Sequence, residues 1–90
     1  MSDHFHLTMD RNIFKLNLPT EATSAYILVA SLMEQNVRPT LDEIRSRWTT
    51  SDSDLDDALR ELIRRRILKV STSTDESPVY FPNPSNLWRK

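Results

Sequence analysis

The side chains of this 90-residue sequence that are best suited to bind another molecule are arginines between positions 45 and 66. A guanidinium carries a permanent charge and a fixed fork of donors that matches a phosphate or a carboxylate. Four of these residues could form one basic rim that contacts phosphates: Arg45, Arg47, Arg60 and Arg64. An alternative is open for residues 64–66, because cations also stabilise the end of a helix that has no glycine cap.

Other kinds of chemistry find little support in the sequence. His4 and His6 have a spacing that can begin a metal site, but nothing nearby in the sequence completes it, and a partly exposed strand is the simpler interpretation. The absence of cysteine excludes disulfides and thiolate ligands, and the absence of glycine excludes glycine-rich phosphate loops. No catalytic arrangement follows from residue spacing. We therefore expect neither an enzyme nor a bound cofactor.

The composition is that of one ordinary globular domain, with 38% hydrophobic and 28% charged residues. The net charge of −1 and the pI of about 6.1 provide no overall field that would attract nucleic acid. The N-terminus lacks the pattern of a signal peptide, and the apolar run 25–30 is far shorter than the roughly 20 residues that cross a bilayer. We therefore expect a cytoplasmic protein that does not contact a membrane.

The stretch 52–66 has the clearest helical pattern of the chain. Its apolar residues recur at the spacing of one helical face: Leu55, Ala58, Leu59, Leu62 and Ile63. Its opposite face carries Ser53, Asp57, Arg60, Glu61 and Arg64. The spacing predicts a helix that buries the first set and exposes the second.

A shorter helix with its own start signal precedes this one. Thr40 and Glu43 form a capping box, in which the threonine accepts from the backbone and the glutamate reaches back to the cap. This predicts a helix from there to Trp48, followed by a tight turn and a cap at Ser51. Residues 36–39 form a linker that could hold one very short strand.

The first long helix is predicted at about 21–35, with Thr20 as its N-cap. Its apolar residues fill a broad arc, so it should be the central helix of the core. Ile27 lies outside that arc. Either the N-terminal strand or the C-terminal tail covers it, or it contacts a second copy of the chain.

The remaining segments alternate apolar and polar residues. Residues 4–18 are predicted as a strand or hairpin, and residues 67–72 and 79–81 as a second hairpin around a polar loop. Trp88 in the tail is expected to dock on the core. The predicted boundaries are an N-terminal arm at 1–19, a domain at 20–82 and a tail at 83–90.

This order of elements resembles the winged helix-turn-helix superfamily, including small bacterial regulators of the MarR and PadR kind. The resemblance rests on LDEIRSRW, on SDSDLDDALRELIRRRILKV and on PVYF. It implies an α+β, mainly α fold of three helices and a C-terminal hairpin wing, with an extra N-terminal strand or hairpin. It also implies a small transcriptional regulator that reads double-stranded DNA with residues 52–66. The implied contacts are Arg45, Arg47, Ser53, Asp57, Arg60 and Arg64, with no metal.

The charges favour an alternative, a winged helix that binds a basic protein instead of DNA. The predicted wing tip contains Asp75 and Glu76, where wings that enter the minor groove use arginine or lysine. A homodimer is a further expectation, formed through residues 4–18 and the exposed side of the first helix. Such a dimer would place two recognition helices on successive major grooves.

Overall fold

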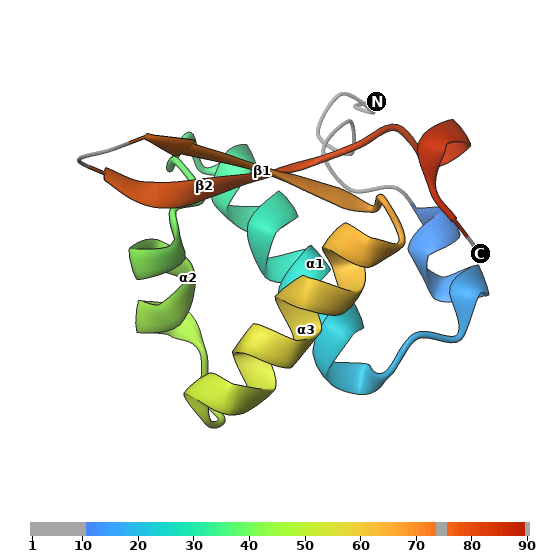
Figure 1. Cartoon of the computed structure of the whole chain (residues 1–90), viewed down its shortest axis with the longest axis horizontal. Coiled ribbons are helices and arrows are strands. Elements are labelled where there is room, and N and C mark those ends of the chain that lie inside the picture. The colour runs from blue at the N-terminus through green and yellow to red at the C-terminus, as the bar shows by residue number, and fades with distance from the viewer. Residues whose placement is uncertain (1–10, 74–75, 90) are drawn as a thin grey trace.

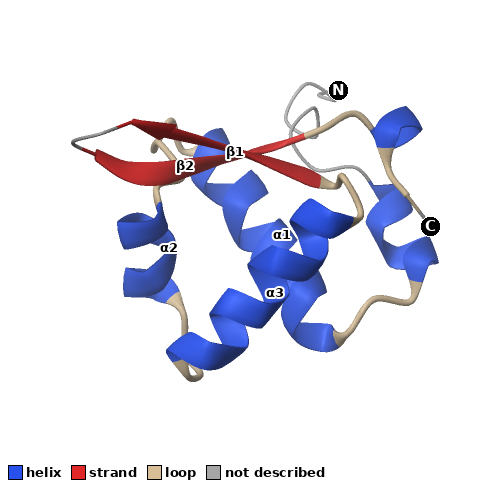
Figure 2. Cartoon of the chain, in the orientation of Figure 1, coloured by secondary structure: helices blue, strands red, loops and turns tan. Residues whose placement is uncertain are grey.

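Three α-helices and one antiparallel hairpin make up most of the described chain (Figures 1 and 2). The computed structural model describes residues 11–73 and 76–89. In chain order the elements are η2 (Arg11–Leu16), α1 (Thr20–Glu34), α2 (Leu41–Arg47), α3 (Asp52–Arg64), β1 (Leu68–Ser73), β2 (Glu76–Pro82) and η3 (Ser85–Leu87). The fold is thus mainly helical with a small C-terminal hairpin, which confirms the α+β class. No helix in the described ranges is long and apolar enough to cross a membrane.

Helices α1 and α3 pack against each other and provide most of the core (Figure 1). The buried residues of α3 are four of the five predicted ones: Leu55, Ala58, Leu59 and Leu62. The α1 residues follow the predicted broad arc: Ala22, Ala25, Tyr26, Val29, Ala30 and Leu32. Both helices therefore bury the face that their apolar spacing predicted.

The prediction that Thr20 caps α1 is wrong. Thr20 is the first helical residue, and the cap position belongs to Pro19, whose backbone is extended with ψ 149°. The Pro19 carbonyl accepts the first helical hydrogen bond, from the Thr23 N–H at 3.1 Å. Proline suits this place because its fixed φ leads directly into a helix.

Helices α1 and α3 end in the same way, with one residue in the left-handed conformation after the cap. That residue is Asn36 after α1 and Arg66 after α3, each with φ 61°. The next backbone N–H then reaches back into the helix, from Val37 to the Leu32 carbonyl at 2.8 Å and from Ile67 to that of Leu62 at 2.9 Å. This is the Schellman geometry, which usually uses glycine. The predicted helix over 52–66 is thus two residues too long.

We expect Arg66→Gly to stabilise the domain by about 1 kcal/mol, because a left-handed residue with a Cβ costs about 1–2 kcal/mol that glycine avoids. The measurement is the midpoint of urea unfolding. Asn36→Gly is the matched control at the same φ. Asparagine tolerates this conformation, so its replacement should gain clearly less. An equal gain at both sites, or none at position 66, would contradict the proposed strain.

Only half of the predicted capping box at α2 forms. The Thr40 hydroxyl accepts from the Glu43 backbone N–H at 3.1 Å, which confirms the cap. The Glu43 carboxylate was predicted to reach back to the cap, but it pairs with Arg47 one turn later instead. The Thr40 N–H donates instead to the Arg38 carbonyl at 2.8 Å, so it does not need the glutamate.

The C-terminal hairpin also pairs with the segment before α2. In the register of β1 and β2, Leu68 lies opposite Pro82 and Val70 opposite Tyr80. On its other side β2 forms a bridge between Val79 and Thr40. The Tyr80 N–H also donates to the Pro39 carbonyl at 3.0 Å. The one-residue bridge therefore forms at Thr40, directly after the linker 36–39 in which the sequence allowed a very short strand.

The predicted N-terminal strand is wrong over its second half. Residues 11–16 form the 3-10 helix η2, in which Ile13 is fully buried and Phe14 is 56% exposed. In a strand, alternation would put Phe14 and Leu16 on the same apolar face. A 3-10 helix has three residues per turn, and this period directs Ile13 and Leu16 to the core instead. Residues 4–10, with His4 and His6, lie outside the described residues. The tail prediction is confirmed, since Trp88 docks against Tyr26.

Candidate functional site

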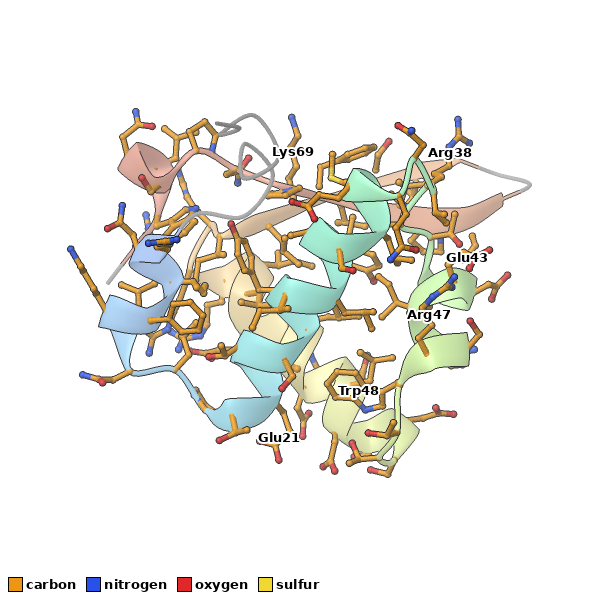
Figure 3. All side chains as sticks on the ribbon, turned by 180° about the vertical axis from the view of Figure 1, so that it is seen from behind. Glu21, Arg38, Glu43, Arg47, Trp48 and Lys69 are labelled. Atoms are coloured by element: carbon orange, nitrogen blue, oxygen red, sulfur yellow. The ribbon has the colours of Figure 1, made fainter. Side chains whose placement is uncertain are left out.

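The outer face of α2 and α3, joined by the turn at 48–51, holds all six residues that were predicted as a binding site. Two hydrogen bonds shape the turn. The Ser51 hydroxyl accepts from the Asp54 N–H at 3.1 Å, as its predicted cap role requires, and the Trp48 indole donates to the Ser51 carbonyl at 3.2 Å. Figure 3 shows Trp48 beside this turn. The turn therefore fixes how α3 projects from α2.

All six predicted residues are exposed: Arg45, Arg47, Ser53, Asp57, Arg60 and Arg64. Two come from α2 and four from α3, whose buried face points the other way. The helical periodicity of 52–64 thus placed the α3 residues correctly. The same spacing also places a carboxylate three or four residues from Arg47, Arg60 and Arg64, within reach on the same helix.

Every arginine of the predicted rim forms an ion pair with a carboxylate. Arg60 lies 2.7 Å from Asp56 and 3.9 Å from Asp57. Arg64 lies 2.8 Å from Glu61, which also accepts from Arg65 at 2.5 Å. The two arginines of α2 pair with Glu43 and, at 3.8 Å, with Asp52. Figure 3 shows Glu43 and Arg47 on neighbouring turns of α2. These guanidinium groups therefore present little free positive charge.

Carboxylates outnumber arginines over the two helices and their turn. Residues 41–64 contain four arginines and seven acids: Asp42, Glu43, Asp52, Asp54, Asp56, Asp57 and Glu61. The net charge of this segment is therefore −3. Asp52 and Asp54 lie in the first turn of α3, where the helix dipole favours a negative charge. That local role explains two of the acids but not the full excess of carboxylates over arginines.

An acidic hollow of about 300 Å³ lies between the start of α1 and α3. It is lined by Pro19, Glu21, Ala22, Asp54, Asp57, Ala58 and Glu61. Hydrogen bonds from Arg65 and then Arg64 hold the pKa of Glu61 below its ordinary value, so this carboxylate stays charged in mildly acidic solution. Within the described part of the chain, no three acidic or histidine side chains are grouped to hold a metal ion. The hollow combines small apolar walls with a negative rim.

The hollow was not predicted from the sequence, although three of its acidic residues follow a helical spacing. Asp54, Asp57 and Glu61 are spaced i, i+3 and i+7, which places them in one row along α3. Glu21 belongs to another helix, and only the packing of α1 on α3 brings it to the same row.

Comparison of the chain with models of protein families, with curated proteins and with solved structures finds no match.

Proposed function

We propose that the chain is a winged-helix domain that binds a basic protein through the outer face of α3 and the acidic hollow. The order of elements supports the winged helix. In the described chain, α1 is followed by a one-residue β-bridge to β2. Two helices joined by a tight turn come next, and the hairpin follows them. In such a domain, α3 would be the helix that contacts the partner.

One observation carries the choice of partner: each arginine of the predicted rim is already paired with a carboxylate. Exposed pairs are worth only about 0–1 kcal/mol each, so a phosphate could displace one of them. The released carboxylates would then face the DNA backbone, and the segment would still carry its net charge of −3. Phosphate contact is therefore disfavoured across the whole face.

A lysine or arginine side chain matches the hollow in both shape and charge. Its aliphatic stem can lie against Ala22 and Ala58, while its cationic head reaches the carboxylates of Asp54 and Asp57. Charge complementarity of this kind steers association and selects partners. The partner is thus a protein that presents an exposed basic side chain.

We test this with a fluorescent decalysine peptide, titrated with the protein and followed by anisotropy. The peptide should bind, and Asp54→Asn with Asp57→Asn should weaken it by roughly fivefold, because each lost exposed pair contributes about 0.5 kcal/mol. Glu34→Gln with Asp42→Asn removes the same charge outside the hollow and should change the affinity less. Equal weakening by both double variants, or no binding of decalysine, would overturn the proposal.

Duplex DNA is the second candidate partner, favoured by the helix-turn-helix order and by the exposure of Arg60 and Arg64 on α3. A mixed-sequence duplex of about 20 base pairs, titrated at about 50 and 200 mM salt, separates the two candidates. Binding that falls steeply with salt and disappears in Arg60→Gln with Arg64→Gln would establish DNA as the partner of this face. The homodimer remains a prediction, now without a strand at residues 11–16.

A further inference from the structure

In the part of the chain that the structure describes, most of the cations without a carboxylate partner belong to segments at the end of the molecule opposite α2. The molecule is 38 Å along its longest axis. In Figure 1, the blue η2 segment and the red tail lie at one end of that axis and α2 at the other. Among the described residues, no carboxylate pairs with five exposed cations: Arg11, Lys15, Arg66, Lys69 and Arg89. These cations contrast with the paired arginines of α2 and α3.

Hydrogen bonds join the segments that carry these cations. The Arg89 N–H donates to the Arg65 carbonyl at 2.6 Å, which ties the tail to the end of α3. The Asn83 side chain donates to the Arg66 carbonyl at 2.9 Å. The Asn12 amide donates to the Ser85 hydroxyl at 3.4 Å and so links η2 to η3. The segments that carry these cations, namely η2, the end of α3 and the tail, are therefore held close together.

A hollow of about 410 Å³ opens between η2 and the tail. Its lining consists of Asn12, Lys15, Leu16, Ser85, Asn86 and Trp88. Lysine, asparagine and serine side chains are the groups that proteins use to contact phosphates and sugars. The hollow has such groups from two segments at once, and Arg89, which follows the lining residue Trp88 in the chain, is exposed.

An exposed aromatic ring is carried by η2, the segment that forms one wall of this hollow. Phe14 is 56% exposed, although its neighbour Ile13 is fully buried. With three residues per turn, η2 turns Ile13 inward, Asn12 and Lys15 to the hollow, and Phe14 to the third side with Arg11. An exposed aromatic ring on the same short helix as two cations, Arg11 and Lys15, is suited to stack on an unpaired base.

We propose that this end of the protein binds single-stranded nucleic acid. Phe14 stacks on a base, and Lys15 and Arg89 contact the phosphates on either side of the hollow. Single strands are favoured over a duplex because only an unstacked base can reach the ring. The site shares no residue with the acidic hollow, so it stands independently of the proposed protein partner.

Labelled oligo(dT) and oligo(U) of about 20 nucleotides, followed by anisotropy in low salt, test the proposal against a duplex of equal length. The wild-type protein should bind at least one single strand more tightly than the duplex. Phe14→Ala should weaken that binding by about tenfold, the usual effect of losing one stacked base. Leu87→Ala, which also removes an exposed apolar side chain, is the control and should leave binding unchanged.

Lys15→Gln with Arg89→Gln should lower the slope of log affinity against log salt by about 1.4, because each lost phosphate contact with a single strand contributes about 0.7. Arg60→Gln with Arg64→Gln makes the same charge change on α3 and should leave the slope as it is. Tighter binding of the duplex, full binding by Phe14→Ala, or equal slopes in both double variants would overturn the proposal. Self-association of the wild-type protein that is lost in the Lys15→Gln, Arg89→Gln variant would also overturn the proposal, since the cations would then bind a second copy of the chain.

Discussion

Trp88→Ala should lower the free energy of unfolding by about 3–5 kcal/mol, the usual cost of truncating a buried tryptophan. Trp88 is only 8% exposed although it is the third residue from the end of the chain. Its ring meets that of Tyr26 edge-on, with 5.8 Å between centroids, and its indole donates to the Asn83 carbonyl at 2.9 Å. The truncation would open a cavity beside α1 and leave the Asn83 carbonyl without this donor.

Urea unfolding followed by far-UV circular dichroism measures this effect. Leu87→Ala is the matched control, because Leu87 is adjacent but 51% exposed and should cost about 0.5 kcal/mol or less. Trp88→Phe separates the two contributions, since it retains an aromatic ring and loses the indole donor. A tail that only lies on the surface would give the same small loss at positions 87 and 88.

Ile44→Ala should cost about 2–5 kcal/mol and loosen α2 in particular. Helix α2 has seven residues, far fewer than the roughly 12–15 that an isolated helix needs to be marginally stable in water. Ile44 is its one fully buried residue, and its neighbours on that face, Leu41 and Trp48, are only partly buried. The attachment of α2 therefore depends on this side chain.

Ile27→Ala is the matched control, the same substitution at a side chain of α1 that is 37% exposed. It should cost clearly less. Amide hydrogen exchange should show loss of protection in residues 41–47 for Ile44→Ala and no such local effect for Ile27→Ala. A large, concentration-dependent loss at Ile27 would instead indicate that a second copy covers this side chain, as the predicted homodimer requires.

Local patterns in the sequence determined the helices, most of their buried faces and two of their three caps. The apolar spacing over 52–66 gave the inward face of α3 without further information, because residues three and four apart on a helix must share a side. The N-caps Ser51 and Thr40 could be predicted for a similar reason, since an N-cap side chain bonds to a backbone group only three residues away. The docking of Trp88 also followed from residue type, because a tryptophan is costly to leave in water.

Tertiary structure alone decided which charges from different segments lie together, and with them the candidate sites. The carboxylate partners of Arg47, Arg60 and Arg64 lie three or four residues away on the same helix, so sequence spacing already indicates these pairs. Arg45, in contrast, meets Asp52 only because the turn at 48–51 brings α2 and α3 together. Glu21 joins Asp57, and Lys15 joins Ser85, only because segments distant in sequence pack together. The physical reason is the different distance along the chain over which these interactions act. Hydrogen-bonding and apolar periodicity act over three or four residues, whereas the field at a surface sums over every charge that folding brings near it.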